Sequence, residues 1–109
     1  MERAVYDLYI YKGEDYLLTT GWKIDKEPID FTGWTAAIQI RRGMNGGLIA
    51  EMECDIEAVE GKINLTLQNR FTAQLNPGTY AWDLKLTDEG GTVWYPLTGK
   101  CYVYGRSTE

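Results

Sequence analysis

Apolar and polar side chains alternate along almost the whole chain, which is the pattern of half-buried strands. In the segment Leu48 to Ile56, the carboxylates of Glu51, Glu53 and Asp55 alternate with the apolar side chains of Met52, Cys54 and Ile56. Ile63, Leu65 and Leu67 form another apolar stripe with the same period of two. Turn signals separate such segments at short intervals, and the clearest is Asn45-Gly46, a pair that favours tight hairpin turns. The pattern predicts an all-β sandwich.

The segment from Leu75 to Leu86 is the most specific of these strands. A Pro77-Gly78 turn precedes Tyr80, which lies two positions before Trp82. An immunoglobulin-like sandwich has its tyrosine corner at this place, although Trp82 takes the usual position of a cysteine. We therefore expect an immunoglobulin-like β-sandwich of about seven or eight antiparallel strands, with at most one short helical turn near 70–75. Its structural core is predicted to include Tyr80, Trp82, Leu84, Ile38 and Leu65.

Length and composition limit the number of domains and the classes of partner. The 109 residues are expected to form a single domain, 1–109, and they carry a net charge of -5. This acidic balance argues against nucleic-acid binding, which needs clustered Lys and Arg. No segment has the length or apolarity of a membrane span, and the first residues lack the apolar region of a signal peptide. Cys54 and Cys101 are most simply buried free thiols, and whether they pair is left open.

The residue types exclude most enzymatic chemistry. Histidine is absent and Ser107 is the only serine, so no catalytic triad is available. Two cysteines without histidine fall short of a zinc site, and no phosphate-binding loop occurs, so we expect no catalytic residues, metal or cofactor. The carboxylates of Glu51, Glu53 and Asp55 share one strand face, which is typical of a solvated face. Asp83 is expected to pair with Lys85 or a cross-strand cation.

Tyrosines give the most suggestive surface. If Leu8 and Ile10, together with Tyr6, face the core, Tyr9 and Tyr11 face outward. By the same alternation, Tyr102 and Tyr104 face outward if Cys101 and Val103 are buried. First and last strands of such sandwiches often pair, and four outward tyrosines, Tyr9, Tyr11, Tyr102 and Tyr104, would then form one candidate interface. The alternative is that tyrosine simply favours exposed strand positions, and both interpretations stay open.

Four blocks in order resemble a known group of domains. They are Tyr6–Glu14, Pro28–Ala36, Pro77–Leu84 and Leu97–Val103. This order resembles β-sandwich modules of tailed bacteriophages, including the N-terminal domain of baseplate upper proteins and sandwich domains of tail-fibre-associated proteins. Those modules carry a Pro-Ile-Asp-Leu-Thr-Gly block, in which Phe31 replaces the leucine here, and a Gly-x-Tyr-x-x-Asp block that matches Gly78 to Asp83.

The resemblance implies a non-enzymatic structural protein of the virion, made in the host bacterial cytoplasm and present in many copies. The expected role is an attachment or adaptor module of the tail or baseplate, with other virion proteins as partners and homo-oligomers among its assemblies. Because the sequence holds one domain, a capsid decoration protein that bridges capsomers is the alternative. A third hypothesis is a glycan-binding module in which Trp22, Trp34 or Trp94 is exposed and stacks on a sugar.

Overall fold

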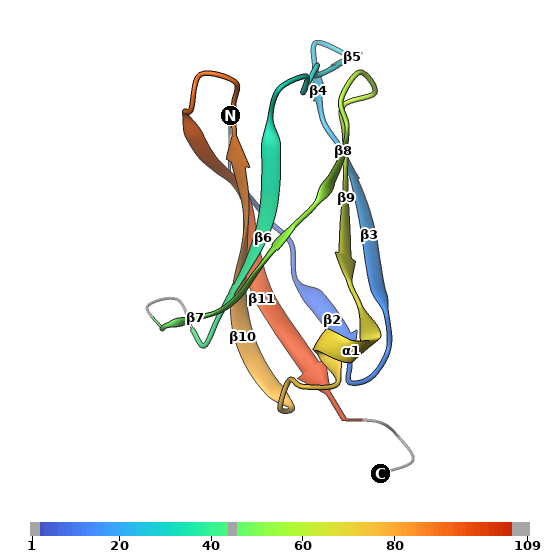
Figure 1. Cartoon of the computed structure of the whole chain (residues 1–109), viewed down its shortest axis with the longest axis vertical. Helices are drawn as coiled ribbons and strands as arrows, with labels where there is room; N and C mark the ends of the chain where they lie inside the picture. The colour runs from blue at the N-terminus through green and yellow to red at the C-terminus, as the bar shows by residue number, and fades with distance from the viewer. Residues whose placement is uncertain (1–2, 44–45, 106–109) are drawn as a thin grey trace.

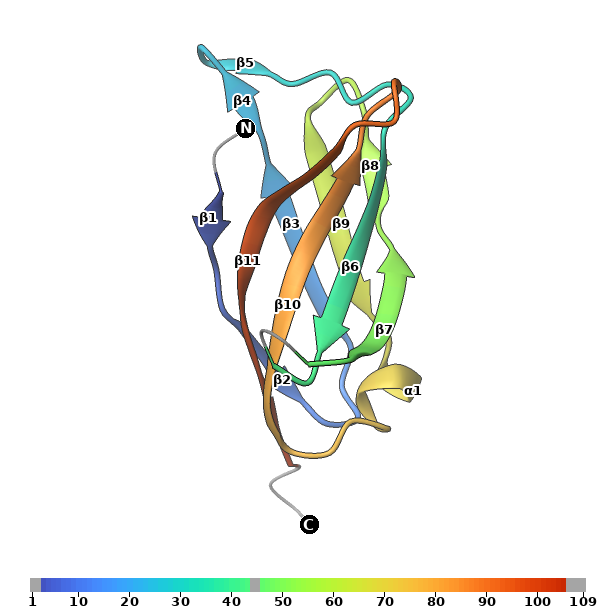
Figure 2. The same cartoon turned by 90° about the vertical axis from the view of Figure 1, so that its left-hand side faces the viewer.

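The computed structural model describes residues 3–43 and 46–105, and it shows two β-sheets packed face to face in an elongated molecule (Figure 1). The larger sheet has the order β1-β11-β10-β6-β7, and β2 pairs with β11 beside β1. Figure 2 looks onto its outer face. Its strands are β1 (Ala4–Val5), β2 (Leu8–Tyr11), β6 (Thr35–Arg41), β7 (Leu48–Glu53), β10 (Gly78–Thr87) and β11 (Val93–Tyr104).

The second sheet has the order β3-β9-β8 and lies behind the first in Figure 2. A two-stranded ribbon of β4 and β5 extends from one end of the sandwich, and one helical turn, α1, lies near the other end. These elements are β3 (Tyr16–Gly21), β4 (Lys23–Ile24), β5 (Glu27–Pro28), β8 (Asp55–Glu57), β9 (Lys62–Leu67) and α1 (Asn69–Thr72).

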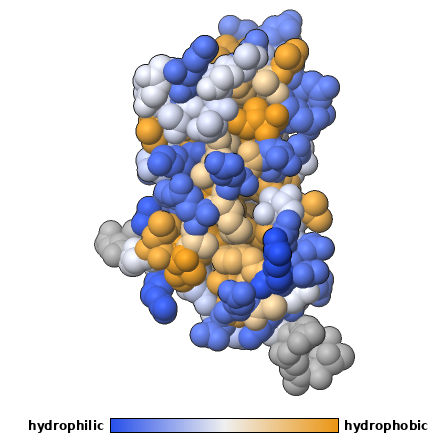
Figure 3. Space-filling view, viewed as in Figure 1, coloured by the Kyte–Doolittle hydropathy of each residue, from blue (hydrophilic) through white to orange (hydrophobic). Residues whose placement is uncertain are grey.

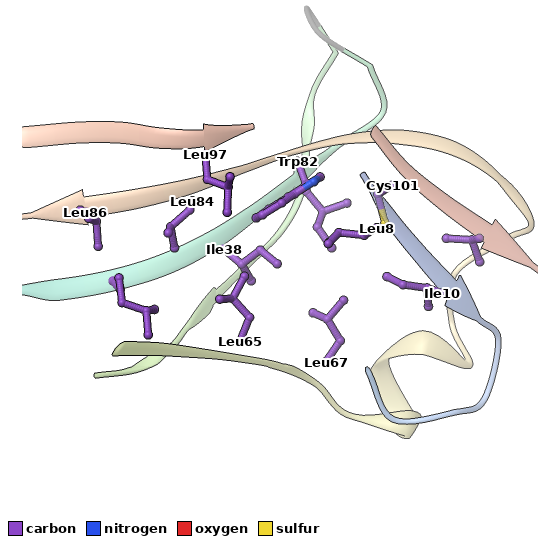
Figure 4. Packing of buried hydrophobic residues seen from close by; sticks show 14 of the residues in the cluster. Leu8, Ile10, Ile38, Leu65, Leu67, Trp82, Leu84, Leu86, Leu97 and Cys101 are labelled. Atoms are coloured by element: carbon purple, nitrogen blue, oxygen red, sulfur yellow. The ribbon is translucent and has the colours of Figure 1, made fainter. Parts of the chain in front are cut away.

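The core lies between the two sheets and follows the alternation of the sequence (Figure 4). On β10 every second side chain from Trp82 onward is fully buried, and the same holds for β9 from Ile63. Burial of a Leu, Ile or Trp side chain contributes on the order of 2 kcal/mol, so this stripe is the main stabilising element of the fold. The all-β sandwich and its short helical turn are confirmed. Of the five predicted core residues, four are buried: Trp82, Leu84, Ile38 and Leu65.

Tyr80, the fifth, lies half-buried at the margin of the core and forms the tyrosine corner. Its hydroxyl donates a 2.7 Å hydrogen bond to the carbonyl oxygen of Asn76, four residues upstream. This bond fixes the turn that starts β10, as the spacing of Tyr80 and Trp82 predicts. The role of Tyr80 is therefore to hold the entry to the strand, and Trp82 fills the centre of the sandwich.

Several strands differ from the expected ones. The segment Leu48 to Ile56 divides at Cys54, where β7 leaves the larger sheet and the chain continues as β8 of the smaller one. The pairing of β1 and β2 with β11 is parallel, so the sandwich is not wholly antiparallel. The Asn45-Gly46 pair cannot be compared because Asn45 lies outside the described residues. The flanking strands β6 and β7 do pair as an antiparallel hairpin.

The expectation that Tyr6 faces the core with Leu8 and Ile10 is wrong, since Tyr6 is 46% exposed. The chain crosses β11 between β1 and β2, and the backbone of Tyr6 passes over Gly99 at this point. The Trp82 Nε1–H donates a 2.8 Å hydrogen bond to the carbonyl oxygen of Tyr6. The buried indole therefore binds the N-terminal segment to the sheet. This backbone contact, and not burial of the ring, holds Tyr6 in position.

Hydrogen bonds of Thr72 link the β2–β3 turn to α1. Its buried hydroxyl donates to the carbonyl oxygen of Glu14 at 2.8 Å and accepts from the backbone N–H of Gly13 at 3.1 Å. Asp15 Oδ1 accepts a second bond between these elements, from the backbone N–H of Asn69 at 2.6 Å. Although Gly13 and Glu14 are 59 and 58 residues away from Thr72 along the chain, one side chain satisfies both backbone groups.

We expect Thr72→Val to lower the free energy of unfolding by about 1–3 kcal/mol, because valine fills the space but leaves two partly buried backbone groups without their partner. Urea unfolding followed by tryptophan fluorescence measures this loss. Thr66→Val is the matched control, since Thr66 is an exposed residue of β9 and should change stability by less than about 0.5 kcal/mol. Equal effects of the two variants would show that the hydroxyl of Thr72 contributes nothing.

Candidate interaction surface

Four tyrosines lie together on the outer face of the larger sheet, where β2 and β11 pair. The register aligns Tyr9 with Tyr102 and Tyr11 with Tyr104. On the inner face of the same strands Leu8, Ile10, Cys101 and Val103 are buried. The alternation of the two strands therefore directs Tyr9, Tyr11, Tyr102 and Tyr104 outward, and we call this group the tyrosine surface. The strands lie at the lower end of the face seen in Figure 2.

The rings of the tyrosine surface pair across the strands. The centroids of Tyr9 and Tyr102 are 5.2 Å apart with 17° between the ring planes, and those of Tyr11 and Tyr104 are 5.4 Å apart with 32° between the planes. Tyr9 and Tyr11 are each 52% exposed, and Tyr104 is 42% exposed. The pKa of Tyr9 is raised, first by desolvation and then by the charge of Asp7 and the neighbouring tyrosines. The cluster is therefore a surface of paired aromatic rings that is partly open to solvent.

A shallow groove lies beside the tyrosine surface, with a volume of about 360 Å³. Its lining combines the small residues Ala81 and Gly99 with two acidic and two basic residues. The Arg41 Nε lies 3.9 Å from Asp83 Oδ2 across β6 and β10, which confirms the predicted cross-strand partner of Asp83. Because both side chains are partly exposed, this pair adds at most about 1 kcal/mol to stability. The lining residues are Val5, Asp7, Arg41, Ala81, Asp83, Thr98, Gly99 and Lys100.

A second depression, of about 490 Å³, lies where β7 passes into β8, on the side shown in Figure 3. Met52 and Phe71 supply its apolar part, and hydrophilic residues surround them. The polar groups there already bind one another: Arg70 Nε donates to Gln68 Oε1 at 3.1 Å, and Asn64 Nδ2 donates to Glu57 Oε2 at 3.1 Å. Apolar residues on this face are divided among several small patches. Phe71 is the one aromatic residue among the described residues that line this depression, which therefore has no ring pair like those of the tyrosine surface.

The predicted solvated face of Glu51, Glu53 and Asp55 is exposed on β7 and β8. Glu51 accepts a hydrogen bond from Gln39 Nε2 on the neighbouring strand. Among residues 3–43 and 46–105, no group of three His, Cys, Asp or Glu side chains gathers as metal ligands would. Ser107 lies outside these residues. In the part of the chain that the structure describes, no helix has the length and apolarity needed to cross a bilayer.

The three tryptophans considered for sugar stacking are half-buried, so the expectation that they are exposed is wrong. Trp22 Nε1 donates to Thr20 Oγ1 at 2.9 Å, and Trp34 packs edge-on against Phe31 with centroids 5.1 Å apart. Trp94 contacts Asp88 with its indole nitrogen at 3.5 Å. Contacts with neighbouring side chains therefore cover part of each ring.

Both cysteines are free thiols, and Cys101 lies directly behind the tyrosine surface on β11. Burial raises the pKa of Cys101 from 9.0 to about 12. Burial also raises the pKa of Cys54 to about 11, and the charge of Asp55 adds to the shift. Both groups are therefore protonated and poorly nucleophilic at neutral pH.

These shifts predict that the folded protein loses stability between pH 9 and 11. Above pH 9 the unfolded chain releases its thiol protons while the folded chain keeps them, so the free energy of unfolding falls by up to about 1.4 kcal/mol per pH unit for each thiol. Urea unfolding at pH 8 and pH 10 measures the slope, and Cys101→Ala should reduce it. An unchanged slope in that variant would show that Cys101 ionises alike in both states.

Similar proteins were found by comparison of structures and not by comparison of sequences. No protein-family model matches this sequence, and no curated protein matches it either. The N-terminal domain of phage TP901-1 ORF48 superimposes with a TM-score of 0.57 at 14% identity, and the match covers 94% of this chain and 88% of that one. Fibronectin(III)-like modules of Clostridium thermocellum CbhA give 0.49 at 15% identity, over 96% of this chain and 91% of theirs. The chain thus shares its β-sandwich fold with a phage domain.

Sequence reasoning found the tyrosine surface but not the groove beside it. The four tyrosines follow from strand alternation once the first and last strands are assumed to pair. The groove depends on Ala81 and Gly99 coming close together on the paired strands β10 and β11, where Ala81 is in register with Lys100, and neither small residue has a side chain that marks a site. The placement of Gly99 opposite Trp82 carries a weak signal, since a glycine within a strand often marks a close approach of another backbone.

Proposed function

We propose that this chain is a structural module of a tailed-phage virion that attaches to other virion proteins in the tail or baseplate. The observation that carries the proposal is the fold that it shares with a phage N-terminal domain over nearly the full length of both chains. The order of the four sequence blocks points to the same class of phage module independently of that superposition.

The tyrosine surface supports a role in protein contact. Stacked tyrosines give a large, rigid contact area that loses little conformational entropy on binding, and tyrosine is enriched at the energetic centres of interfaces. The adjacent groove offers a depression for a protruding side chain of the partner, and both basic residues (Arg41 and Lys100) and acidic residues (Asp7 and Asp83) line it. The mechanism is docking of preformed surfaces, without a chemical step.

Quantitative mass spectrometry of purified particles tests the proposal. We expect the chain to be present at a fixed stoichiometry of a few to some dozens of copies per particle, as tail and baseplate symmetry requires. Copy numbers in the hundreds would replace the tail location with capsid decoration. Absence of the chain from particles that are otherwise complete would overturn the virion role.

A further inference from the structure

Strand β3 forms a free edge of the smaller sheet. It pairs with β9 alone among the strands in residues 3–43 and 46–105. The backbone N–H of Trp22 donates to the carbonyl oxygen of Gly61 at 2.8 Å, in the register that joins β3 to β9. In an antiparallel pair the groups of alternate residues point to the partner, so those of Leu17, Thr19 and Gly21 point away from β9. This edge therefore presents a row of donors and acceptors.

The β3 edge also lacks the usual protection against pairing. Tyr16–Gly21 contains no charged residue and no proline, although natural edge strands commonly carry one or both. By contrast β7, at an edge of the larger sheet, carries Glu51 and Glu53 and continues directly into β8. Leu17 is 72% exposed, so a large apolar side chain stands unprotected on this strand.

We propose that two copies of this chain pair through β3 as antiparallel strands, forming one continuous six-stranded sheet. The outward backbone groups admit only registers that pair odd-numbered residues of the two strands, and the proposed one pairs Leu17 of one copy with Thr19 of the other, with Leu18 opposite Leu18 on the two-fold axis. In this register both strands direct their free N–H and C=O groups at each other. Each side chain of β3 stays on the face of the sheet, outer or inner, that it occupies in the single copy.

Charge at the ends of β3 fits a second copy. Glu14 and Asp15 precede the strand and Lys23 follows it. Antiparallel pairing places Lys23 of each copy beside the acidic residues of the other, while the strands between them remain uncharged. Each copy carries a net charge of -5, so a contact with few carboxylates in its centre limits the repulsion between two copies.

Such a dimer leaves the tyrosine surface free, because β2 and β11 belong to the other sheet. It would present two tyrosine surfaces at once and bind a multivalent partner more strongly than one copy does. The pairing does not depend on a virion role, since it is a property of the isolated chain.

Sedimentation equilibrium of the isolated chain tests the pairing. We expect a concentration-dependent dimer, and Leu17→Lys should raise its dissociation constant about tenfold or more because it introduces a charge at the edge. Val59→Lys is the matched control, since Val59 is 77% exposed but lies outside β3, and it should leave dimerisation unchanged. A wild-type chain that is monomeric throughout the concentration range would overturn the proposal.

A backbone variant separates edge pairing from side-chain contact. Thr19→Pro removes an N–H that points away from β9 and should abolish the dimer while tryptophan fluorescence shows a folded monomer. Thr19→Ala is its control, because it also loses the 2.7 Å bond from Thr19 Oγ1 to Asn64 Oδ1 but keeps the backbone donor. A dimer that survives Thr19→Pro would contradict the pairing.

Oxidative cross-linking tests the register. Leu18→Cys should form an intermolecular disulfide, because the two Leu18 positions face each other on the axis. Thr20→Cys should not, because its counterpart lies four residues away along the second strand. Cross-linking in the reverse order, or a dimer that is lost in Tyr9→Ala but kept in Leu17→Lys, would overturn the β3 contact. If an extended peptide of another protein binds the edge while the chain stays monomeric, the second copy is likewise excluded.

Discussion

Replacing Gly99 with alanine is expected to lower the free energy of unfolding by about 3 kcal/mol or more, the largest loss that we expect from any single methyl group in this chain. A Cβ at this position would overlap the carbonyl oxygen of Tyr6 and lie 2.7 Å from its carbonyl carbon. The obstructing atoms belong to the backbone, so no side-chain rotation relieves the contact. The N-terminal segment must move, and the bond from Trp82 Nε1 to Tyr6 is then lost.

Urea unfolding followed by tryptophan fluorescence measures this effect. Gly47→Ala is the matched control, because a Cβ there meets no atom of residues 3–43 and 46–105 within 4 Å, and we expect a change of less than about 1 kcal/mol. In Gly99→Ala, parallel pairing of β2 with β11 should weaken as well, which exchange of the backbone amides of Leu8 and Ile10 would report. Equal stability of the two variants would show that the crossing at Gly99 does not constrain the fold.

The double variant Tyr9→Ala/Tyr102→Ala is expected to reduce incorporation of the chain into particles by about tenfold or more, while the isolated domain stays folded. Removal of a central aromatic contact typically costs about 2 kcal/mol of binding, and this variant removes two rings of one stacked pair. The measurement is the amount of the variant in purified particles that were assembled without the wild-type chain. Circular dichroism of the isolated variant shows whether it is folded.

The control for that experiment is Tyr6→Ala/Tyr95→Ala, which removes two exposed tyrosines outside the tyrosine surface. Like the Tyr9→Ala/Tyr102→Ala variant, this control replaces two partly exposed tyrosines with alanine, so both variants lose the same number of aromatic rings. Normal incorporation of this control beside loss of the Tyr9/Tyr102 variant would locate the contact. Equal incorporation of both variants would contradict a role of the tyrosine surface in attachment.

Much of the fold follows from local patterns in the sequence. Alternation at Ile63, Leu65 and Leu67 predicts a buried stripe on β9, and the spacing of Tyr80 and Trp82 predicts the corner before β10. Both features depend on residues that are close together along the chain, where strand period and turn chemistry decide the structure. The tyrosine surface needed one long-range assumption, that the first and last strands are neighbours, and the structure places them side by side.

The features that the sequence did not predict depend on contacts between distant segments. The segment Leu48 to Ile56 alternates without interruption, so no local signal marks the change of sheet at Cys54. Tyr6 continues the alternation of Leu8 and Ile10, which predicts a buried ring. In the structure its backbone carbonyl oxygen accepts a hydrogen bond from Trp82, 76 residues later, and its ring is exposed. The direction of a pairing strand is likewise set by the path of the whole chain, and alternation is the same in parallel and antiparallel strands.

Electron microscopy of the assembled particle, at a resolution that shows side chains, tests attachment through the tyrosine surface most directly. We predict density for this sandwich in the tail or baseplate, with Tyr9, Tyr11, Tyr102 and Tyr104 buried against another virion protein. A particle that contains the chain with these four tyrosines facing solvent, and with its contacts on another face, would contradict the proposed attachment.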